Sequence, residues 1–227
     1  MKISSKVTMM IVSSLLVLGA ILVFLNIYEQ NKAIEFSTKQ LTETILADKR
    51  AALSEEMDIV SNILLKIQEV YDDANETIED QKEDIIDYLS KARFGDDKKG
   101  YFSIYTTKGV VISSPGVPEY NGLDRLEATD ADGYKYIKDL MQKASENSEG
   151  AFVNFVAKAK DGSTTRKIGK GLKLNLFHED VVLMSVVNLE GMYKEIDKIS
   201  ATMQNDAKAN TTNFIVIAVV VLIISLI

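Results

Sequence analysis

The sequence predicts an α+β protein in which a long N-terminal helix packs on a five-stranded, mostly antiparallel sheet, with a transmembrane helix on either side. Three observations predict this fold. Two apolar runs lie near the ends of the 227-residue chain, a helical seam of apolar residues follows the first run, and five strand-like runs with turn signals follow the seam.

The two apolar runs are predicted to enter a membrane. Val7–Ile27 holds 21 residues without a charge, enough to span a hydrocarbon core that needs roughly 20 helical residues. Phe214–Ile227 holds 14 residues and stops too early to cross, so we expect the natural protein to continue. Lys2 and Lys6 precede the first run without an acidic residue, which places the N-terminus in the cytoplasm. The first run exceeds the apolar core of a signal peptide, about 7–15 residues, and is predicted to be an uncleaved anchor.

The segment between the runs, Tyr28–Asn213, is acidic and lacks cysteine. Its 33 acidic and 24 basic residues give a net charge of −9, which argues against a nucleic-acid partner. Zero cysteines exclude disulfides and thiol chemistry, and a single histidine excludes a histidine-rich metal site. The sequence contains no G-x-S-x-G, P-loop or G-x-G-x-x-G motif. We therefore expect no enzyme activity, no cofactor and no metal.

Apolar residues spaced alternately by four and three predict a long helix after the first run. No glycine or proline lies between Gly19 and Gly95, so the simplest interpretation is one helix from about Tyr28 to about Ala92. A break near Ala47–Ala52, where the spacing loses register, is an alternative. The seam either forms a coiled-coil homodimer or packs on the chain's own domain. It comprises Leu53, Met57, Val60, Leu64, Ile67, Tyr71, Ala74, Ile78, Gln81, Ile85 and Tyr88.

The strand-like runs are separated by turn and helix signals. Thr106–Gly109 and Lys160–Ser163 each join two runs as hairpin turns. Pro115–Asp132 is rich in turn-forming residues and is predicted to be a loop, whereas Tyr134–Ala144 has helical spacing. After the last strand, helical spacing resumes and leads into the second apolar run. The predicted strands are Tyr101–Tyr105, Val110–Ser114, Ala151–Ala159, Thr164–Leu172 and Asp180–Val187.

Four short motifs follow one another in the strand region. Gly100–Tyr105 begins with Gly-Tyr-Phe, Gly109–Pro115 ends a strand at proline, Pro118–Gly122 is Pro-x-x-x-Gly and Asp130–Gly133 is Asp-x-Asp-Gly. In this order, and between two predicted membrane spans, they resemble the single-Cache domain. This PAS-like extracytoplasmic sensor module belongs to bacterial methyl-accepting chemotaxis receptors and some sensor kinases. The resemblance covers about Gly100–Met192.

The chain departs from the family pattern at two places. Ser114 stands where the family has a histidine before the proline, and Val186–Asn188 replaces a Gly-x-Tyr-like pattern at the end of the last strand. Lys167 matches the family's lysine on the fourth strand. The departures leave the expected fold intact but leave the identity of the ligand open, because they fall where a pocket would lie.

The resemblance implies a small-molecule pocket on one face of the sheet, covered by Pro115–Gly133, and relatives often bind short carboxylates such as acetate, propionate, lactate or pyruvate. Strand alternation places three hydroxyl side chains of the first strand on one face, which either lines this pocket or faces water. A carboxylate needs fixed donors or a cation, which Lys167 and Arg125 would supply unless both are solvated surface residues. The candidate ligand-binding residues are Tyr101, Ser103, Tyr105, Ser114, Pro115, Arg125 and Lys167.

We therefore predict the sensing portion of a transmembrane chemotaxis receptor, a multi-pass protein of the cell inner membrane with its sensor domain in the periplasm. The expected partners are a small molecule, the lipid bilayer, a second copy in a homodimer and cytoplasmic signalling proteins that act through the missing C-terminal part. Two alternatives stay open: the sensor portion of a histidine kinase or cyclic-dinucleotide enzyme, and a non-sensing membrane adaptor. The expected segments are a cytoplasmic N-terminus (1–6), a first transmembrane helix (7–27), a long membrane-proximal helix (28–94), a sensor sheet (95–192), an exit helix (193–213) and a truncated second transmembrane helix (214–227).

Overall fold

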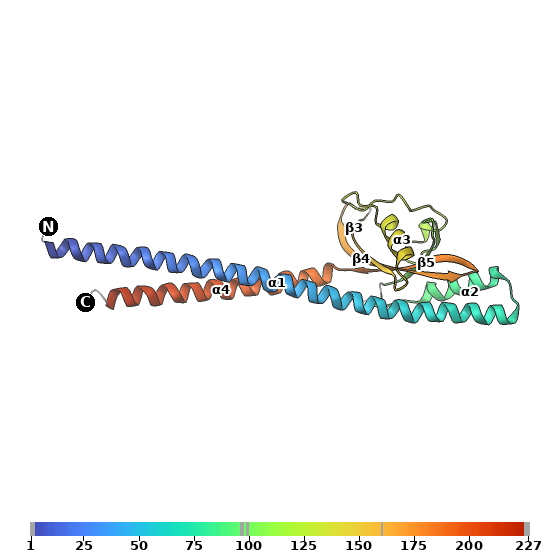
Figure 1. Cartoon of the computed structure of the whole chain (residues 1–227), viewed down its shortest axis with the longest axis horizontal. Coiled ribbons are helices and arrows are strands. Elements are labelled where there is room, and N and C mark those ends of the chain that lie inside the picture. The colour runs from blue at the N-terminus through green and yellow to red at the C-terminus, as the bar shows by residue number, and fades with distance from the viewer. Residues whose placement is uncertain (1–2, 96–97, 99, 160, 225–227) are drawn as a thin grey trace. The chain divides into compact units, whose positions relative to one another are not determined.

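The computed structural model describes residues 3–95, 98, 100–159 and 161–224 (Figure 1). The chain divides into two compact units, one formed by Met1–Ile45 with Met192–Ile227 and the other by Leu46–Gly191. The elements in chain order are α1 (Ile3–Ala74), α2 (Ile78–Lys91), β1 (Phe102–Thr106), β2 (Val111–Ser113), the 3₁₀ helix η1 (Pro118–Tyr120), α3 (Tyr136–Glu146), β3 (Ala151–Lys158), β4 (Thr164–Leu176), β5 (Glu179–Asn188) and α4 (Glu190–Ile224).

The first unit consists of the N-terminal part of α1 and most of α4. Each helix contains a window long and apolar enough to cross a membrane, and no residue of either window is buried. A polar contact joins the two helices. The Thr211 hydroxyl lies 3.2 Å from Gln30 Oε1 and 3.4 Å from Asn26 Oδ1, and Gln30 Nε2 donates to Asn26 Oδ1 at 2.7 Å. Interhelical hydrogen bonds of this kind stabilise the pairing of apolar helices.

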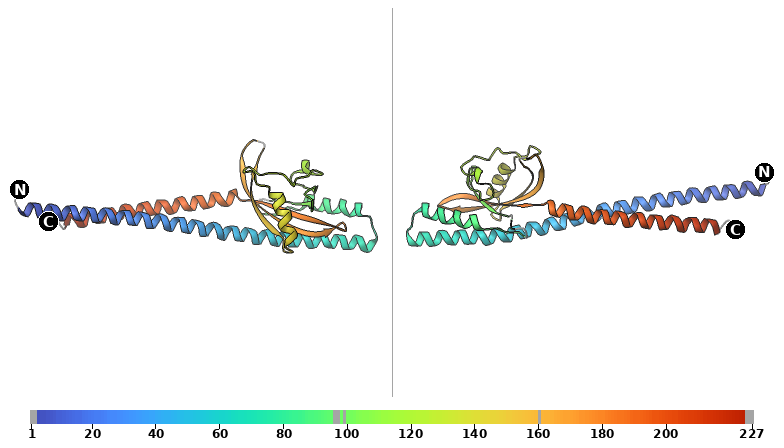
Figure 2. Two further views of the ribbon diagram at one scale, coloured as in Figure 1. Left: turned by 45° about the horizontal axis from the view of Figure 1, so that its top comes forward. Right: turned by 180° about the vertical axis from the view of Figure 1, so that it is seen from behind.

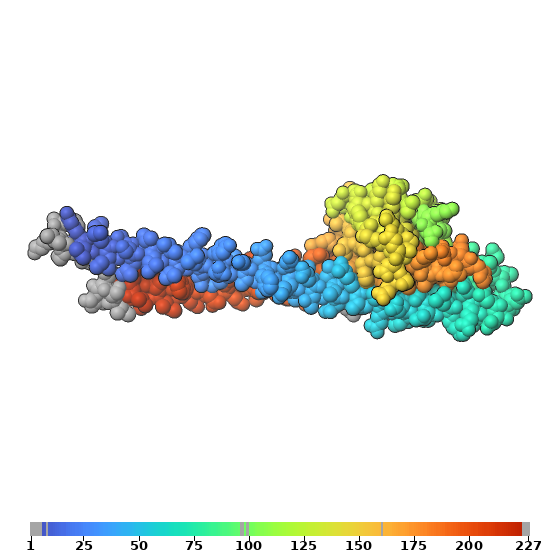
Figure 3. Space-filling model, in the orientation of Figure 1, coloured from blue at the N-terminus to red at the C-terminus, as the bar shows by residue number. Residues whose placement is uncertain are grey.

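The second unit is built on one sheet with the strand order β2-β1-β5-β4-β3. Every neighbouring pair of these five strands is antiparallel, so the predicted α+β fold is confirmed. Within this unit, α3 and the segment before it cover one face of the sheet, while α2 and the second part of α1 lie on the other face (Figures 2 and 3). The sheet is therefore the middle layer of the unit.

Strand alternation separates two buried layers of side chains. Tyr105 of β1 and Met184 of β5 belong to a core cluster with Ile137 and Leu140 of α3. Phe102 and its alternate neighbours point to the opposite face, toward α1 and α2. The apolar residues of β1, β4 and β5 that are at most 1% exposed on that face are Phe102, Ile104, Ile168, Leu176, Val181 and Leu183.

The first part of the predicted seam is buried within the chain. Four seam residues of α1 are at most 4% exposed. One to two helical turns later, Gln68 Oε1 accepts a hydrogen bond from the backbone N–H of Phe177 at 2.7 Å, and Asp72 Oδ1 lies 3.2 Å from His178 Nε2. The alternative in which the seam packs on the chain's own domain is therefore confirmed for this part. The four residues are Leu53, Met57, Val60 and Leu64.

The prediction of one continuous helix to about Ala92 is wrong. α1 ends just before Asn75, whose φ is 59°, and Thr77 then caps α2 by accepting a hydrogen bond at 3.1 Å from the backbone N–H three residues later. Asparagine tolerates the left-handed region and threonine is a favoured N-cap, so the chain turns without glycine or proline. The alternative break near Ala47–Ala52 is also wrong, because α1 is continuous there.

The hairpin of β4 and β5 is longer than predicted. β4 continues four residues beyond Leu172, and the two-residue turn consists of Phe177 and His178, both with φ of 58°. This turn cannot be predicted from its residue types, because tight hairpin turns with positive φ usually contain glycine or asparagine. The contacts of Gln68 and Asp72 with the turn hold it in this uncommon conformation.

Candidate functional site

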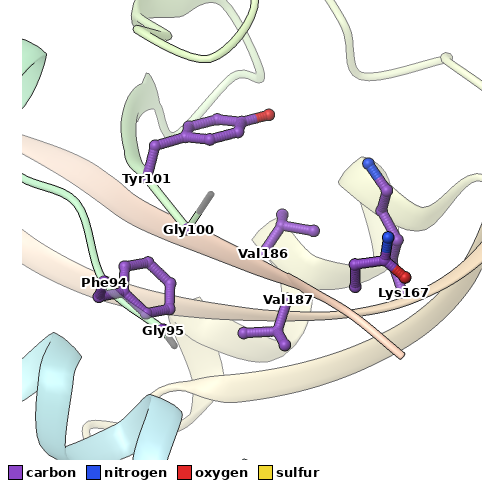
Figure 4. Close-up of a pocket in the computed structure, with 8 residues that line it drawn as sticks. Phe94, Gly95, Gly100, Tyr101, Lys167, Val186 and Val187 are labelled. Carbon is purple, nitrogen blue, oxygen red and sulfur yellow. The ribbon is translucent and has the colours of Figure 1, made fainter. Parts of the chain in front are cut away.

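A cavity of about 190 Å³ opens beside the last residues of β5 (Figure 4). β1 pairs with β5 only as far as Phe102↔Ser185, whereas β4 pairs with β5 up to Asn188. One edge of β5 is therefore left without β1 beside it, and the cavity lies along this edge. Its lining residues are Phe94, Gly95, Gly100, Tyr101, Lys167, Val186, Val187 and Asn188.

Lys167 is the charged side chain among these lining residues. It lies on β4, between Phe155 of β3 and Asn188 of β5. Burial lowers the pKa of the Lys167 ammonium, and no carboxylate among the described residues forms an ion pair with it. Figure 4 shows that Lys167 and Tyr101 lie on the same side of β5. A desolvated ammonium without a counter-ion favours an anionic ligand.

Three tyrosines, of which Tyr105 is buried and the other two are half-buried, form a group over the same face of the sheet. Tyr101 precedes β1, Tyr105 lies in β1 and Tyr136 begins α3. Burial raises the pKa of each hydroxyl, and the electrostatic influence of neighbouring tyrosines raises the pKa values further. The hydroxyls therefore stay protonated at neutral pH and are available as hydrogen-bond donors. The Tyr136 ring is held by stacking on Phe155, with centroids 4.1 Å apart.

Arg125 joins the tyrosine group from Pro115–Gly133, the segment over the sheet that is called the cover below. Its guanidinium lies 4.1 Å from the centroid of the Tyr120 ring, and its positive charge partly offsets the effect of burial on the pKa of Tyr136. Arg125 is half-buried but is not among the residues that line the cavity. It orients the Tyr120 ring of the cover by a cation–π contact.

The covering segment packs directly on Tyr101. A Cβ atom at Gly116 would lie 2.1 Å from Cε1 of the Tyr101 ring, so a larger residue at this position would force the ring or the cover to move. The preceding Pro115 is half-buried. Ser103 Oγ donates to Ser114 Oγ at 3.1 Å, and Asn121 Oδ1 accepts from the Ser114 backbone N–H at 2.8 Å. The cover is thus held by a close contact with Tyr101, by the buried hydrogen bond between Ser103 of β1 and Ser114, and by the half-buried bond between Ser114 and Asn121.

The structure brings together part of the predicted set. Tyr101 and Lys167 line the cavity, and Tyr105 belongs to the adjoining tyrosine group. The Ser103 and Ser114 side chains bond to each other, and Arg125 contacts Tyr120 of the cover. Sequence reasoning missed several residues of the site because they reach it from the cover, the start of α3 or the segment before β1. The missed residues are Phe94, Tyr120 and Tyr136.

The family model of single Cache domain 2 matches residues 45–202. The chain belongs to this family. The match covers the second part of α1, all of the sheet and the start of α4, which is the part of the chain that carries the cavity and the tyrosine group. No curated protein sequence matches the chain.

Solved structures share the fold of this Cache domain. A methyl-accepting chemotaxis protein from Vibrio parahaemolyticus RIMD 2210633 is 21% identical with a TM-score of 0.53, over 67% of this chain and 96% of that one. A Cache chemosensory domain solved to explain carboxylic acid recognition is 19% identical with a TM-score of 0.56, over 65% of this chain and 98% of that one. A periplasmic sensor domain of a chemotaxis protein is 16% identical with a TM-score of 0.56, over 64% and 98%.

Asp130 attaches the cover of the Cache domain to β3. Its Oδ2 accepts from the Val156 backbone N–H at 2.9 Å, while its Oδ1 accepts from the N–H groups of Asp132 and Tyr134, also at 2.9 Å. Burial alone would raise the pKa of the Asp130 carboxyl, but these backbone hydrogen bonds outweigh it and hold the pKa below its usual value. The Asp-x-Asp-Gly motif therefore has a structural role in this chain.

Replacing Asp130 with asparagine is expected to lower the free energy of unfolding at pH 7 by about 1.5 kcal/mol, the low end for hydrogen bonds to a charged group, because the side chain is only half-buried. The pKa is depressed in the folded state, so the carboxylate stabilises the fold above its unfolded pKa, near 4, and this contribution is lost as pH falls through the folded pKa. Denaturant unfolding of both proteins at several pH values measures the difference. If the difference in unfolding free energy between the two proteins does not decrease as the pH falls below about 4, the Asp130 carboxylate does not stabilise the fold in this way.

Proposed function

We propose that this Cache domain senses a small organic anion for a transmembrane chemotaxis receptor. The protein would lie in the inner membrane, with the Cache domain in the periplasm and the apolar parts of α1 and α4 in the bilayer. The observation that supports this proposal most directly is Lys167, a half-buried cation that lines a small cavity without a carboxylate partner among the described residues.

The residues around Lys167 support a short carboxylate as the ligand. Protonated tyrosine hydroxyls can donate hydrogen bonds to carboxylate oxygens, and a charge-assisted bond from the lysine adds affinity. The apolar side chains of Phe94, Val186 and Val187 would contact the carbon chain of the ligand. A cavity of about 190 Å³ suits only a small molecule. A structural neighbour of the chain was solved for its recognition of carboxylic acids.

The proposed signal path follows the chain from the cavity. Asn188 lines the cavity, and α4 begins two residues later at Glu190. Glu190 Oε1 accepts hydrogen bonds from the Arg166 backbone N–H at 2.9 Å and from Arg166 Nε at 3.1 Å, which couples the start of α4 to the strand that carries Lys167. A ligand that binds one position of this strand end better than another would move α4 and the membrane helix that it contains.

Ligand binding to the full chain in lipid nanodiscs tests the proposal. Thermal unfolding is measured with acetate, propionate, lactate and pyruvate, and with acetamide and propionamide as uncharged controls. We expect at least one acid to raise the melting temperature and its amide to leave it unchanged. At a concentration 100 times the dissociation constant, a ligand adds about 2.7 kcal/mol of stability. Stabilisation by the amides alone, or by none of a wide panel of organic anions, would reject the proposal.

A further inference from the structure

Lys170 of β4 is buried on the face of the sheet that packs on α1. The residue is only 4% exposed. An odd number of positions separates it from Lys167, so the two side chains point to opposite faces of the sheet. Its partners on the neighbouring strands are Phe152 and Ser185, and neither carries a charge. The Lys170 ammonium forms no ion pair or hydrogen bond with any described residue, so a desolvated charge lies here without a counter-ion.

Arg50 of α1 reaches the same part of the domain. Its Cζ atom lies 5.9 Å from the centroid of the Phe152 ring, and Lys170 Nζ lies 5.6 Å from the same centroid. Arg50 Nε is buried, and no described residue accepts a hydrogen bond from it. No acidic residue lies three or four positions away on the helix, where a carboxylate could pair with the guanidinium. Arg50 and Lys170 therefore place two positive charges beside one aromatic ring.

The lack of a carboxylate beside these two cations does not follow from the composition, because the chain holds 33 acidic and 26 basic residues. Glu149 lies next to the start of β3 but is exposed and pairs with neither cation. Both cation–π distances are close to the outer limit of about 6 Å, so the ring offsets only part of the cost of removing two charges from water. An anion from solution would offset the remainder.

Packing holds the Lys170 side chain in position. A Cβ atom at Gly150 would lie 3.3 Å from Lys170 Cε and 2.4 Å from the carbonyl oxygen of Gly171, so the backbone passes close to the stem of the lysine. Arg50 and Phe152 are half-buried, so a small ion can reach the two cations from solution.

We infer that Arg50 and Lys170 form a binding site for a small tetrahedral oxyanion, such as phosphate or sulfate. The Nε–H and terminal N–H groups of an arginine form a rigid fork that matches two oxygens of an oxyanion, and the lysine ammonium donates to a further oxygen. The bound ion would link α1 to β4 on the face of the sheet opposite the Lys167 cavity. The inference therefore does not depend on the proposed function.

Phosphate binding to the full chain in nanodiscs of zwitterionic lipid tests the inference. Calorimetric titration with sodium phosphate is expected to show saturable binding, and Arg50→Gln should weaken it at least about tenfold. Arg50→Lys keeps the charge and should recover part of the affinity. Lys173→Gln is the matched control, since Lys173 is an exposed cation of the same strand whose partner is Asp180, and it should bind phosphate as the wild type does. No saturable binding, or equal binding by Arg50→Gln and the wild type, would overturn the inference.

Thermal unfolding in phosphate and in chloride at equal ionic strength gives a second measurement. Phosphate also stabilises proteins without binding a site, so the difference between variants is the decisive quantity. Lys170→Met is expected to raise the melting temperature in chloride, because it removes an unpaired charge, and to lose the additional rise that phosphate gives the wild type.

Lys167→Met separates this site from the cavity and should keep the additional rise in phosphate. If Lys167→Met loses that rise and Arg50→Gln keeps it, phosphate binds in the cavity, which rejects the Arg50–Lys170 site and leaves the proposed function standing.

Discussion

Replacing Lys167 with methionine is expected to weaken binding of a carboxylate to the Cache domain by about 100-fold, since a charge-assisted hydrogen bond to a ligand in a desolvated site contributes about 2–3 kcal/mol. Methionine keeps the length and most of the volume of the side chain but removes the charge. Isothermal titration of the full chain with the acid found in the nanodisc screen measures the effect. Lys108→Met, in the exposed turn between β1 and β2, is the control and should bind as tightly as the wild type.

The same substitution is expected to leave the unliganded protein as stable as the wild type or more stable. Burial lowers the pKa of Lys167, so the charged form is disfavoured in the folded state. The resulting loss of stability is present at neutral pH and diminishes as pH rises from the lowered pKa of the folded state to the higher pKa of lysine in the unfolded chain. Methionine removes this loss. If Lys167 had only a structural role, its replacement would lower the stability of the protein and leave acid binding unchanged. A Lys167→Met protein that is destabilised but binds acids normally would contradict its role in the site.

Much of the fold could be predicted because local sequence patterns carry it. Alternation placed Phe102 and Tyr105 on opposite faces of β1, as the structure confirms. The break after α1 could not be predicted from glycine or proline, because Asn75 adopts the left-handed conformation and Thr77 caps the next helix. The turn at Phe177 and His178 was missed for a similar reason: its conformation is held by contacts with α1 and not by its own residue types.

The candidate site was less predictable because it is assembled by tertiary contacts. Tyr101 and Lys167 could be named because both lie on regular strand positions or next to them. Tyr120 and Tyr136 reach the same region only because the chain between β2 and β3 folds back over the sheet. No spacing pattern in the sequence predicts that this segment folds back over the sheet. Ser103 and Ser114 were predicted to contact the ligand because they are polar, but the structure shows a hydrogen bond between their side chains.

Replacing Gly116 with alanine is expected to destabilise the Cache domain by about 1–3 kcal/mol, the usual cost of forcing an extra methyl group into a packed region. The new Cβ would lie 2.1 Å from Cε1 and 2.2 Å from Cζ of the Tyr101 ring, so either the ring or the cover must move. Because Tyr101 lines the cavity, carboxylate binding should weaken as well. Gly191→Ala is the control, since a Cβ at Gly191 meets no atom within 4 Å, and alanine favours the helix that contains it.

A double-mutant cycle identifies the clash with Tyr101 as the cause. In a Tyr101→Ala background the ring is absent, so adding Gly116→Ala should change the free energy of unfolding by no more than a few tenths of a kcal/mol. A Tyr101→Phe background keeps the ring and should retain the full penalty. An equal penalty in all three backgrounds would mean that backbone freedom at Gly116 matters, and not its contact with the ring. Because the φ of Gly116 lies outside the left-handed region, we expect the contact to account for the effect, so that the cover can pack on Tyr101 only where the chain lacks a side chain above the ring.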